Sequence, residues 1–248
     1  MLGVGISLIN MDIALDRLDR WVAERARDYV TICTVHTVMD CRRDERLRQI
    51  VNAGGMTTPD GMPLVWLSRL AGHRYVSRVY GPDLMLAEMA ASQARGHRHF
   101  FYGGQAGVAV RLAANMRRRF PGVSIVGTLT PPMGTAEELC NAPTAAAINA
   151  AQPDIVWVGL TAPKQERWMA CMRPQLEAPV LIGVGAAFDF HTGRVAQAPR
   201  WMQRAGLEWL FRLLHEPRRL WRRYLIDNPW FLWELARQKL GLKRYDLP

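Results

Sequence analysis

Short apolar runs alternate with longer segments of helical periodicity along most of the chain. Six runs of four to six residues predict buried strands, at 31–35, 55–58, 99–102, 124–127, 155–160 and 179–184. Between them, apolar residues recur three and four positions apart, which predicts helices at 40–52, 81–95, 107–120 and 164–172. Parallel strands need helical crossovers. The alternation therefore predicts an α/β fold with a doubly wound, mainly parallel sheet of the Rossmann-like kind.

The pattern changes near Pro199, after which the periodic segments are all helical. We therefore expect an α/β domain at 1–198 and a basic helical appendage at 199–248. Charge supports this division, because residues 201–248 contain ten Lys and Arg against five Asp and Glu, which is half of the formal net charge of +10. An anionic partner is expected there: nucleic acid, lipid headgroups or a phosphorylated substrate.

The four cysteines, Cys33, Cys41, Cys140 and Cys171, form no C-x-x-C pair and no zinc-type spacing. This argues against a disulfide framework and a structural metal, and favours a reducing compartment. No uncharged run approaches the roughly 20 residues of a membrane-spanning helix, and the N-terminus lacks the basic start of a signal peptide. We expect a cytoplasmic protein that is peripheral at the inner face of the cell membrane.

Ligands of doubly wound sheets bind beyond the carboxyl ends of the strands, so the residues after each strand are the candidates. Thr34 and His36 follow the first predicted strand, and Asp60 follows the second within TTPDG. A carboxylate at this edge can take a proton from an attacking hydroxyl. The alternatives are a Pro-Asp-Gly turn, in which Asp bonds its own backbone, and a structural histidine.

Two later strand ends also carry candidate binding residues. Gly103 and Gly104 precede a helix, where backbone N–H groups can hold a phosphate, although tight geometry alone explains such a turn. The G-x-G-x-x-G spacing and the acidic ribose partner are missing, which disfavours a dinucleotide-dependent oxidoreductase. Lys164 and Gln165 stand at a predicted helix start, either as binding residues or as caps.

The C-terminal appendage, which we call the tail, supplies arginines in place of a metal-binding acidic pair. The chain has no Asp-x-Asp motif, with which many nucleotide-sugar enzymes hold a metal on a diphosphate. Arg212 precedes a cluster of Arg219, Arg222 and Arg223, and a helix beginning at Pro217 would put Arg219 and Arg223 on one face. Guanidinium groups bind phosphate in a bidentate manner, so this face suits a diphosphate. A basic helix docked on the core or on anionic lipid is the alternative.

Six segments occur in the order TTPDGMPLVW, RVYGPDLM, FFYGG, VGLTAPKQE, LIGVGAAFDFHTG and APRWMQRAGLEWLFRLLHEPRRLWRRY. Together they resemble the WecG/TagA/CpsF glycosyltransferase family over roughly residues 30 to 225. The resemblance implies an inverting, metal-independent enzyme without a cofactor. Such an enzyme transfers a sugar from a UDP-sugar to a polyprenyl-diphosphate-linked saccharide in surface or exopolysaccharide synthesis. The implied sugar is N-acetylmannosamine, its uronic acid or glucose.

The resemblance also assigns roles by position. It implies that Asp60 is the general base, that three residues line the substrate pocket, and that three tail arginines close over the diphosphate. The pocket residues are Thr34, Arg78 and Gln165, and the tail residues are Arg212, Arg219 and Arg222. Many members carry Asn where this chain has His36, which leaves open both the role of His36 and the donor sugar.

The main alternative is a basic nucleotide- or nucleic-acid-binding module with the same fold, because tryptophans are interleaved with arginines in the tail. For the transferase we expect no nucleic-acid partner. Trp221, Trp230, Phe231 and Trp233 suit an anionic membrane surface, but they could equally form core or a contact in a homo-oligomer.

Overall fold

In a computed structural model of the chain, residues 1–245 are described, with all their side chains except those of Arg219 and Arg223. Six parallel strands form one sheet in the order β2-β1-β6-β5-β3-β4. They are β1 (Asp28–Cys33), β2 (Met56–Pro59), β3 (Arg98–Gly103), β4 (Ser124–Leu129), β5 (Ile155–Gly159) and β6 (Val180–Gly183). All six predicted strands are present, and the predicted α/β fold with a parallel sheet is confirmed.

Both faces of the sheet are buried, as expected for parallel strands. Phe101 and Trp157 belong to one apolar cluster, whereas their strand neighbours Phe100 and Val156 belong to another. The first face is covered by α1 (Met11–Ala23), α5 (Gly81–Arg95), α6 (Val108–Arg119) and α10 (Ala187–His191). The second is covered by α7 (Ala136–Leu139), α8 (Ala142–Ala150) and α9 (Lys164–Met172). Helices α5 and α9 have the predicted bounds.

The predicted helix at 40–52 is wrong in extent. The structure has two helices there, α2 (Val35–Arg43) and α3 (Glu45–Ala53). Thr34 ends the strand run early because its side chain accepts a hydrogen bond from the backbone N–H of Thr37 and begins α2. Asp44 separates the helices because its carboxylate caps the first turn of α3 at Leu47. The polar capping groups, and not the apolar spacing, set these boundaries.

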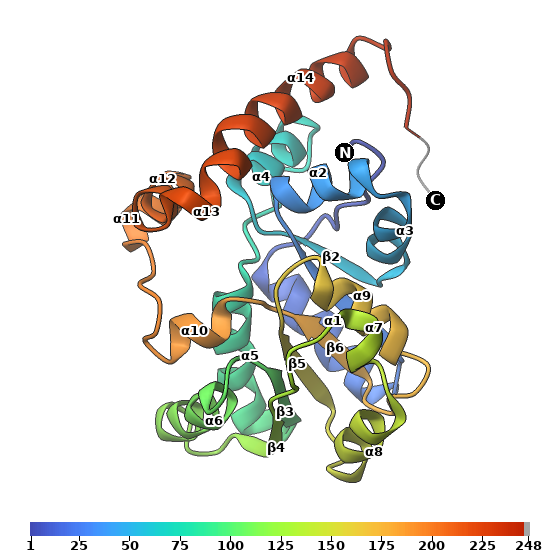
Figure 1. Cartoon of the computed structure of the whole chain (residues 1–248), viewed down its shortest axis with the longest axis vertical. Helices are drawn as coiled ribbons and strands as arrows, with labels where there is room; N and C mark the ends of the chain where they lie inside the picture. The colour runs from blue at the N-terminus through green and yellow to red at the C-terminus, as the bar shows by residue number, and fades with distance from the viewer. Residues whose placement is uncertain (246–248) are drawn as a thin grey trace.

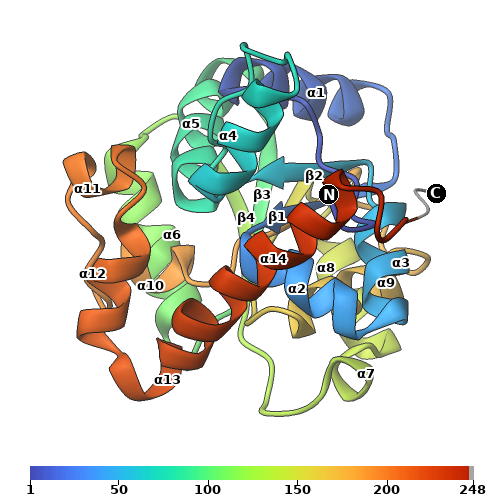
Figure 2. The same ribbon diagram turned by 90° about the horizontal axis from the view of Figure 1, so that it is seen from above.

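The C-terminal segment is helical, as predicted. The helices of the tail are α11 (Arg200–Arg204), α12 (Glu208–His215), α13 (Pro217–Arg222), the π-helix η1 (Arg223–Asp227) and α14 (Asn228–Lys239). Figures 1 and 2 show α14 crossing α2, at the end of the molecule that carries α4 (Met62–Leu70). The wider winding of η1 interrupts the α-helical spacing expected to pair residues 219 and 223. That residues 1–198 form a domain of their own remains a prediction.

The tail is joined to the rest of the molecule mainly through polar contacts. Helix α12 has no buried residue, and α14 buries only Phe231 and Glu234. Phe231 packs in a third apolar cluster with residues of the N-terminal segment and α2. Arg42 of α2 donates to Glu234 at 2.9 Å. None of the helices within residues 1–245 has both the length and the apolar character needed to span a bilayer.

The expectation of no disulfide is wrong. Cys140 and Cys171 are bonded to each other across 31 residues of sequence. The bond joins the end of α7 to α9, and these two helices contact each other in the fold. Spacing along the chain could not indicate this pair, because only the packing of α7 on α9 brings the two sulfurs together. Cys33 and Cys41 are buried free thiols.

Candidate active site

Two adjoining cavities open at the carboxyl end of the sheet, beneath the tail. The larger has a volume of about 420 Å³ and the smaller about 110 Å³. Both are lined by Thr34, His36, Asp60 and Arg212, so the strand ends and α12 of the tail enclose one site. The larger volume is in the range of pockets that take a small organic ligand.

Asp60 lies at the centre of this site. Its backbone N–H continues the sheet by donating to the carbonyl of Cys33 at 2.9 Å, which places its side chain just beyond β2. The side chain accepts from Arg78 at Oδ1, and no backbone N–H of its own turn donates to it among the described residues, unlike in the alternative interpretation. Its Oδ2 has no partner among the described residues and can receive a proton from a ligand.

The pKa of Asp60 is raised to about 6, first because the carboxylate is buried and then because of the charges around it. The guanidinium of Arg78 lowers the pKa, and the carboxylate of Glu208 raises it. Near neutral pH the group is therefore mostly ionised and yet holds a proton more strongly than a surface aspartate. Both properties suit a general base.

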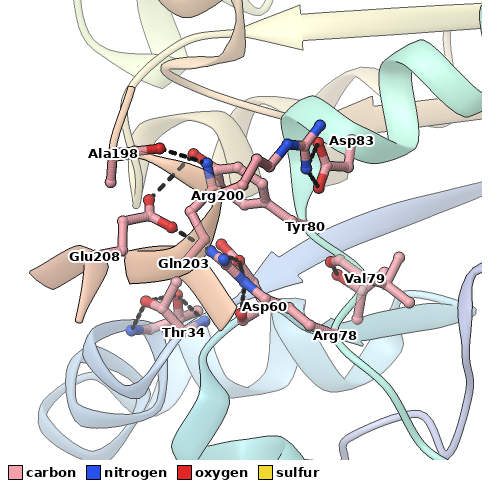
Figure 3. Close-up of polar contacts among 12 residues, drawn as sticks. Thr34, Asp60, Arg78, Val79, Tyr80, Asp83, Ala198, Arg200, Gln203 and Glu208 are labelled. Carbon is pink, nitrogen blue, oxygen red and sulfur yellow. Dashed lines mark hydrogen bonds and ion pairs between the residues drawn. The ribbon is translucent and has the colours of Figure 1, made fainter. Parts of the chain in front are cut away.

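Arg78 is held between two carboxylates. Its Nη2 contacts Asp60 Oδ1 at 2.9 Å and Glu208 Oε2 at 2.7 Å. The guanidinium also lies 4.0 Å from the centre of the Tyr80 ring, and the Tyr80 hydroxyl donates to Glu208 Oε1 at 3.1 Å. Figure 3 shows Asp60 and Glu208 reaching Arg78 from different segments of the chain. Arg78 thus joins Asp60 to the tail.

Thr34 and His36 line the site from the start of α2. The Thr34 hydroxyl is engaged with Thr37 in the helix cap. His36 Nε2 lies 3.3 Å from Asp40 and Nδ1 lies 3.3 Å from Asp227 of η1. Only a protonated imidazole can donate to both carboxylates at once. The structure thus places His36 at the junction between α2 and the tail as well as at the cavity.

Gln165 and its neighbour Glu166 form a buried polar pair at the start of α9. Gln165 Nε2 donates to Glu166 Oε1 at 2.9 Å. Gln165 Oε1, which has no partner among the described residues, belongs to a side chain that lines the larger cavity. Burial raises the pKa of Glu166 to about 7. The contact with Glu166 thus fixes the orientation of this carboxamide at the wall of the larger cavity.

Two of the four predicted phosphate-binding arginines are placed at the site. Arg212 lines both cavities and Arg222 lines the larger one. Neither makes an ion pair with a carboxylate within the described part of the chain, so both guanidinium groups can receive an anion. The side chains of Arg219 and Arg223 lie outside the described residues.

The structure does not bring Gly103 and Gly104 into the lining of these cavities. A Cβ at Gly103 would lie 2.6 Å from the carbonyl oxygen of Gly159, and the N–H of Gly104 donates to that same oxygen at 2.9 Å. These glycines therefore permit the close approach of β3 and β5. The structure thus agrees with the alternative explanation of this turn, in which the glycines are needed for tight backbone geometry.

Sequence reasoning missed three residues that shape the site. Tyr80 and Glu208 hold Arg78, and Asp227 contacts both His36 and Arg43. A signal for two of them was present, because Glu208 and Asp227 are rare acids in a strongly basic tail. An acid in such a surrounding is expected to have a specific cationic partner. No group of three or more His, Cys, Asp or Glu within residues 1–245 is arranged to hold a metal ion.

Comparison with known proteins identifies the family. The model of the family described as "Glycosyl transferase WecG/TagA/CpsF family" matches residues 1–245. The chain is 32% identical over 186 residues to an N-acetylglucosaminyldiphosphoundecaprenol N-acetyl-β-D-mannosaminyltransferase of Bacillus spizizenii, covering 75% of this chain and 70% of that protein. It is 30% identical over 206 residues to the protein of the same name in Bacillus subtilis, covering 83% and 78%.

The match extends over the sheet, the strand-end residues and the tail, and so includes every part of the site described above. The cavity combines a buried carboxylate with arginines that pair with no carboxylate of the described residues, an arrangement that a nucleic-acid-binding module would not require. This chain is an enzyme of the WecG/TagA/CpsF glycosyltransferase family.

Proposed function

We propose that this enzyme transfers a hexosyl group from a UDP-sugar to a polyprenyl-diphosphate-linked saccharide, with inversion at the anomeric carbon. One observation carries the proposal. Within the described part of the chain, Asp60 has a carboxylate oxygen without a partner, in a cavity that also contains Arg212 and Arg222, neither of which pairs with a carboxylate there. A base and an anion-binding group in one cavity are what a direct displacement of a diphosphate requires.

In the proposed reaction, the acceptor hydroxyl oxygen bonds to the anomeric carbon while its proton passes to Asp60 Oδ2. The bond between that carbon and the UDP oxygen breaks, and its electron pair leaves with UDP. Attack opposite the leaving group inverts the anomeric centre. Arg212 and Arg222 stabilise the negative charge that grows on the diphosphate in the transition state. An α-linked donor then gives a β-linked product, and the names of both relatives contain a β-mannosaminyl group.

The donor and acceptor are proposed from the same names. N-acetylmannosamine is the first sugar to test and N-acetylglucosaminyl-diphosphoundecaprenol the first acceptor, because both relatives are named for them. The uronic acid of N-acetylmannosamine and glucose complete the panel, since His36 stands where many family members have Asn. Metal independence belongs to the proposal as well, because two arginines can neutralise the leaving group. Transfer in the presence of EDTA should equal transfer in its absence.

The deciding experiment is Asp60→Asn with release of UDP as the readout. Loss of the base should lower kcat by about a hundredfold or more, while the dissociation constant for UDP stays within about twofold of the wild-type value. The matched control is Asp12→Asn, an exposed aspartate in the first turn of α1. Wild-type turnover by Asp60→Asn would remove the assignment of the base. Failure of the wild-type protein with every donor would remove the proposed reaction.

We also propose that the tail meets an anionic membrane surface at the cytoplasmic face. Its exposed apolar residues include Leu225, Trp230, Leu232 and Trp233. The basic residues Arg222 and Arg237 belong to the same segment. Aromatic and basic side chains together favour a bilayer interface. Vesicles with anionic lipid should carry the protein in a flotation assay, and Leu232→Glu combined with Trp233→Glu should abolish this. Concentration-dependent self-association lost in the same variant would instead assign the surface to a homo-oligomer.

A further inference from the structure

Glu208 is the one acidic residue of the tail that lines the smaller cavity. It comes from the first turn of α12, and its side chain is only 13% exposed. Each carboxylate oxygen has a separate partner, because Oε2 contacts Arg78 at 2.7 Å and Oε1 accepts from the Tyr80 hydroxyl at 3.1 Å. Both partners belong to the segment between β2 and α5, and so the tail is attached beside the base.

The contact of Glu208 with Arg78 restricts how Arg78 can meet Asp60. Arginine and a carboxylate usually form a fork in which two nitrogens bind two oxygens. Here Nε and Nη2 of Arg78 both donate to the same carboxylate oxygen, Asp60 Oδ1, at 3.1 and 2.9 Å, and Nε also donates to the backbone carbonyl of Asp60 at 2.5 Å. Nη2 is also turned toward Glu208. Asp60 Oδ2 consequently faces no cation of the described residues at hydrogen-bonding distance.

We propose that Glu208 is a positioning residue for the general base: it holds Nη2 of Arg78 while the backbone carbonyl of Asp60 holds Nε, which prevents the two-oxygen fork and keeps Asp60 Oδ2 free for the acceptor proton. The inference rests on the proposed transfer reaction and adds to it a residue of the tail that acts through Arg78. Docking of the tail thereby adds two residues to the site: Arg212, which stabilises the leaving group, and Glu208, which positions the base.

The effect of Glu208 on the pKa of Asp60 supports the same role as its contact with Arg78. The groups around Asp60 are Arg78, Glu208, Arg212, Tyr80, Cys33 and His36. Of these, Glu208 is the carboxylate that raises the pKa of Asp60, against Arg78 and Arg212, which lower it. Removing the negative charge of Glu208 should therefore lower the pKa of Asp60, and the ionised base should persist to lower pH but accept a proton less readily.

The test compares Glu208→Gln with Glu208→Ala in the full-length protein. In Glu208→Ala, Nη2 of Arg78 is released from the tail and can turn onto Asp60 Oδ2, while Nε keeps its contact with Oδ1. The acid limb of the kcat/KM profile should move down by about one pH unit, and kcat at pH 8 should fall about tenfold. In Glu208→Gln the side-chain oxygen still accepts from Arg78, so the acid limb should move while kcat falls less. The donor KM should stay within about twofold in both.

Glu177→Gln provides the matched control, because Glu177 is exposed and precedes the amino end of β6 at the opposite edge of the sheet. Its acid limb should coincide with that of the wild type. If Glu208 only fastened the tail, both Glu208 variants would raise KM and leave the acid limb in place, and the inference would be wrong.

A second readout is independent of turnover. Carbon-13 NMR of labelled aspartate carboxyl groups, with the Asp60 resonance identified by its loss in Asp60→Asn, measures the titration of Asp60 directly. A lower Asp60 titration midpoint in Glu208→Ala supports the inference even if no donor is accepted, whereas an unchanged midpoint overturns it. Failure of the proposed reaction and failure of this inference can thus be told apart.

Discussion

The sheet and the tail are held in place by different forces. In the sheet, Phe101, Trp157 and Ile182 are fully buried, and apolar burial provides the main stabilisation. The tail instead fully buries few apolar side chains, Leu220 and Phe231 among them, and docks through ion pairs such as Arg78–Glu208 and Arg43–Asp227. Ionic attachment is weakened by salt and by changes of pH, whereas apolar packing responds to neither in the same way. The proposed active site lies where the two regions meet.

The largest effect is expected inside the sheet, at Phe101→Ala. Phe101 is fully buried and packs edge-to-face against Phe188 with ring centres 5.7 Å apart. Truncation should lower the free energy of unfolding by about 3–5 kcal/mol through lost burial and a residual cavity. Urea denaturation followed by circular dichroism measures this. A loss below about 1 kcal/mol would show that the sheet is not held mainly by its apolar core.

Phe231→Ala makes the same change at the main apolar anchor of the tail. Phe231 is 1% exposed, so its truncation should cost about 3 kcal/mol of stabilising free energy. This loss should weaken the docking of the tail and leave the sheet folded. We expect faster tryptic cleavage within the tail and loss of transfer, with a smaller loss of helical content than in Phe101→Ala. If both variants unfold in one transition with equal loss, the sheet and tail are a single cooperative unit.

The pH dependence of transfer tests the charge on Asp60, which is influenced by residues of both regions. Its pKa is raised to about 6, so the base is ionised above that value and protonated below it. The value of kcat/KM should therefore be highest above pH 7 and should fall about tenfold between pH 7 and pH 5. A profile that is level from pH 8 to pH 5 would contradict a base with this pKa.

The smallest effect is expected from Asp227→Asn. Asp227 is buried and pairs with Arg43 and His36, which joins η1 to α2. Loss of the charge should increase tryptic cleavage of the tail severalfold at low salt. High salt should increase cleavage of the wild type and have less effect on the variant, because the screened pair is already broken. Asp12→Asn, on the exposed face of α1, serves as the control.

The residues at strand ends could be predicted because chain geometry places them. In a parallel sheet every carboxyl end lies at the same edge, so Thr34, Asp60 and Gln165 meet there whatever the connecting loops do. Arg212 was also predicted, although only the order of motifs assigned it to the site. The contact between Arg78 and Glu208 of the tail could not be foreseen, because no periodicity relates residues 78 and 208.

The sequence by itself determined the strands, the parallel sheet, the basic tail and the candidate base, because local periodicity and strand-end geometry depend on neighbouring residues alone. Only the tertiary structure decided that Glu208 holds Arg78, that Asp227 meets His36, and that Cys140 bonds to Cys171. Each of these pairs joins residues far apart along the chain. Their distances follow from how helices pack on the sheet and on one another, and residue type and spacing do not encode that information.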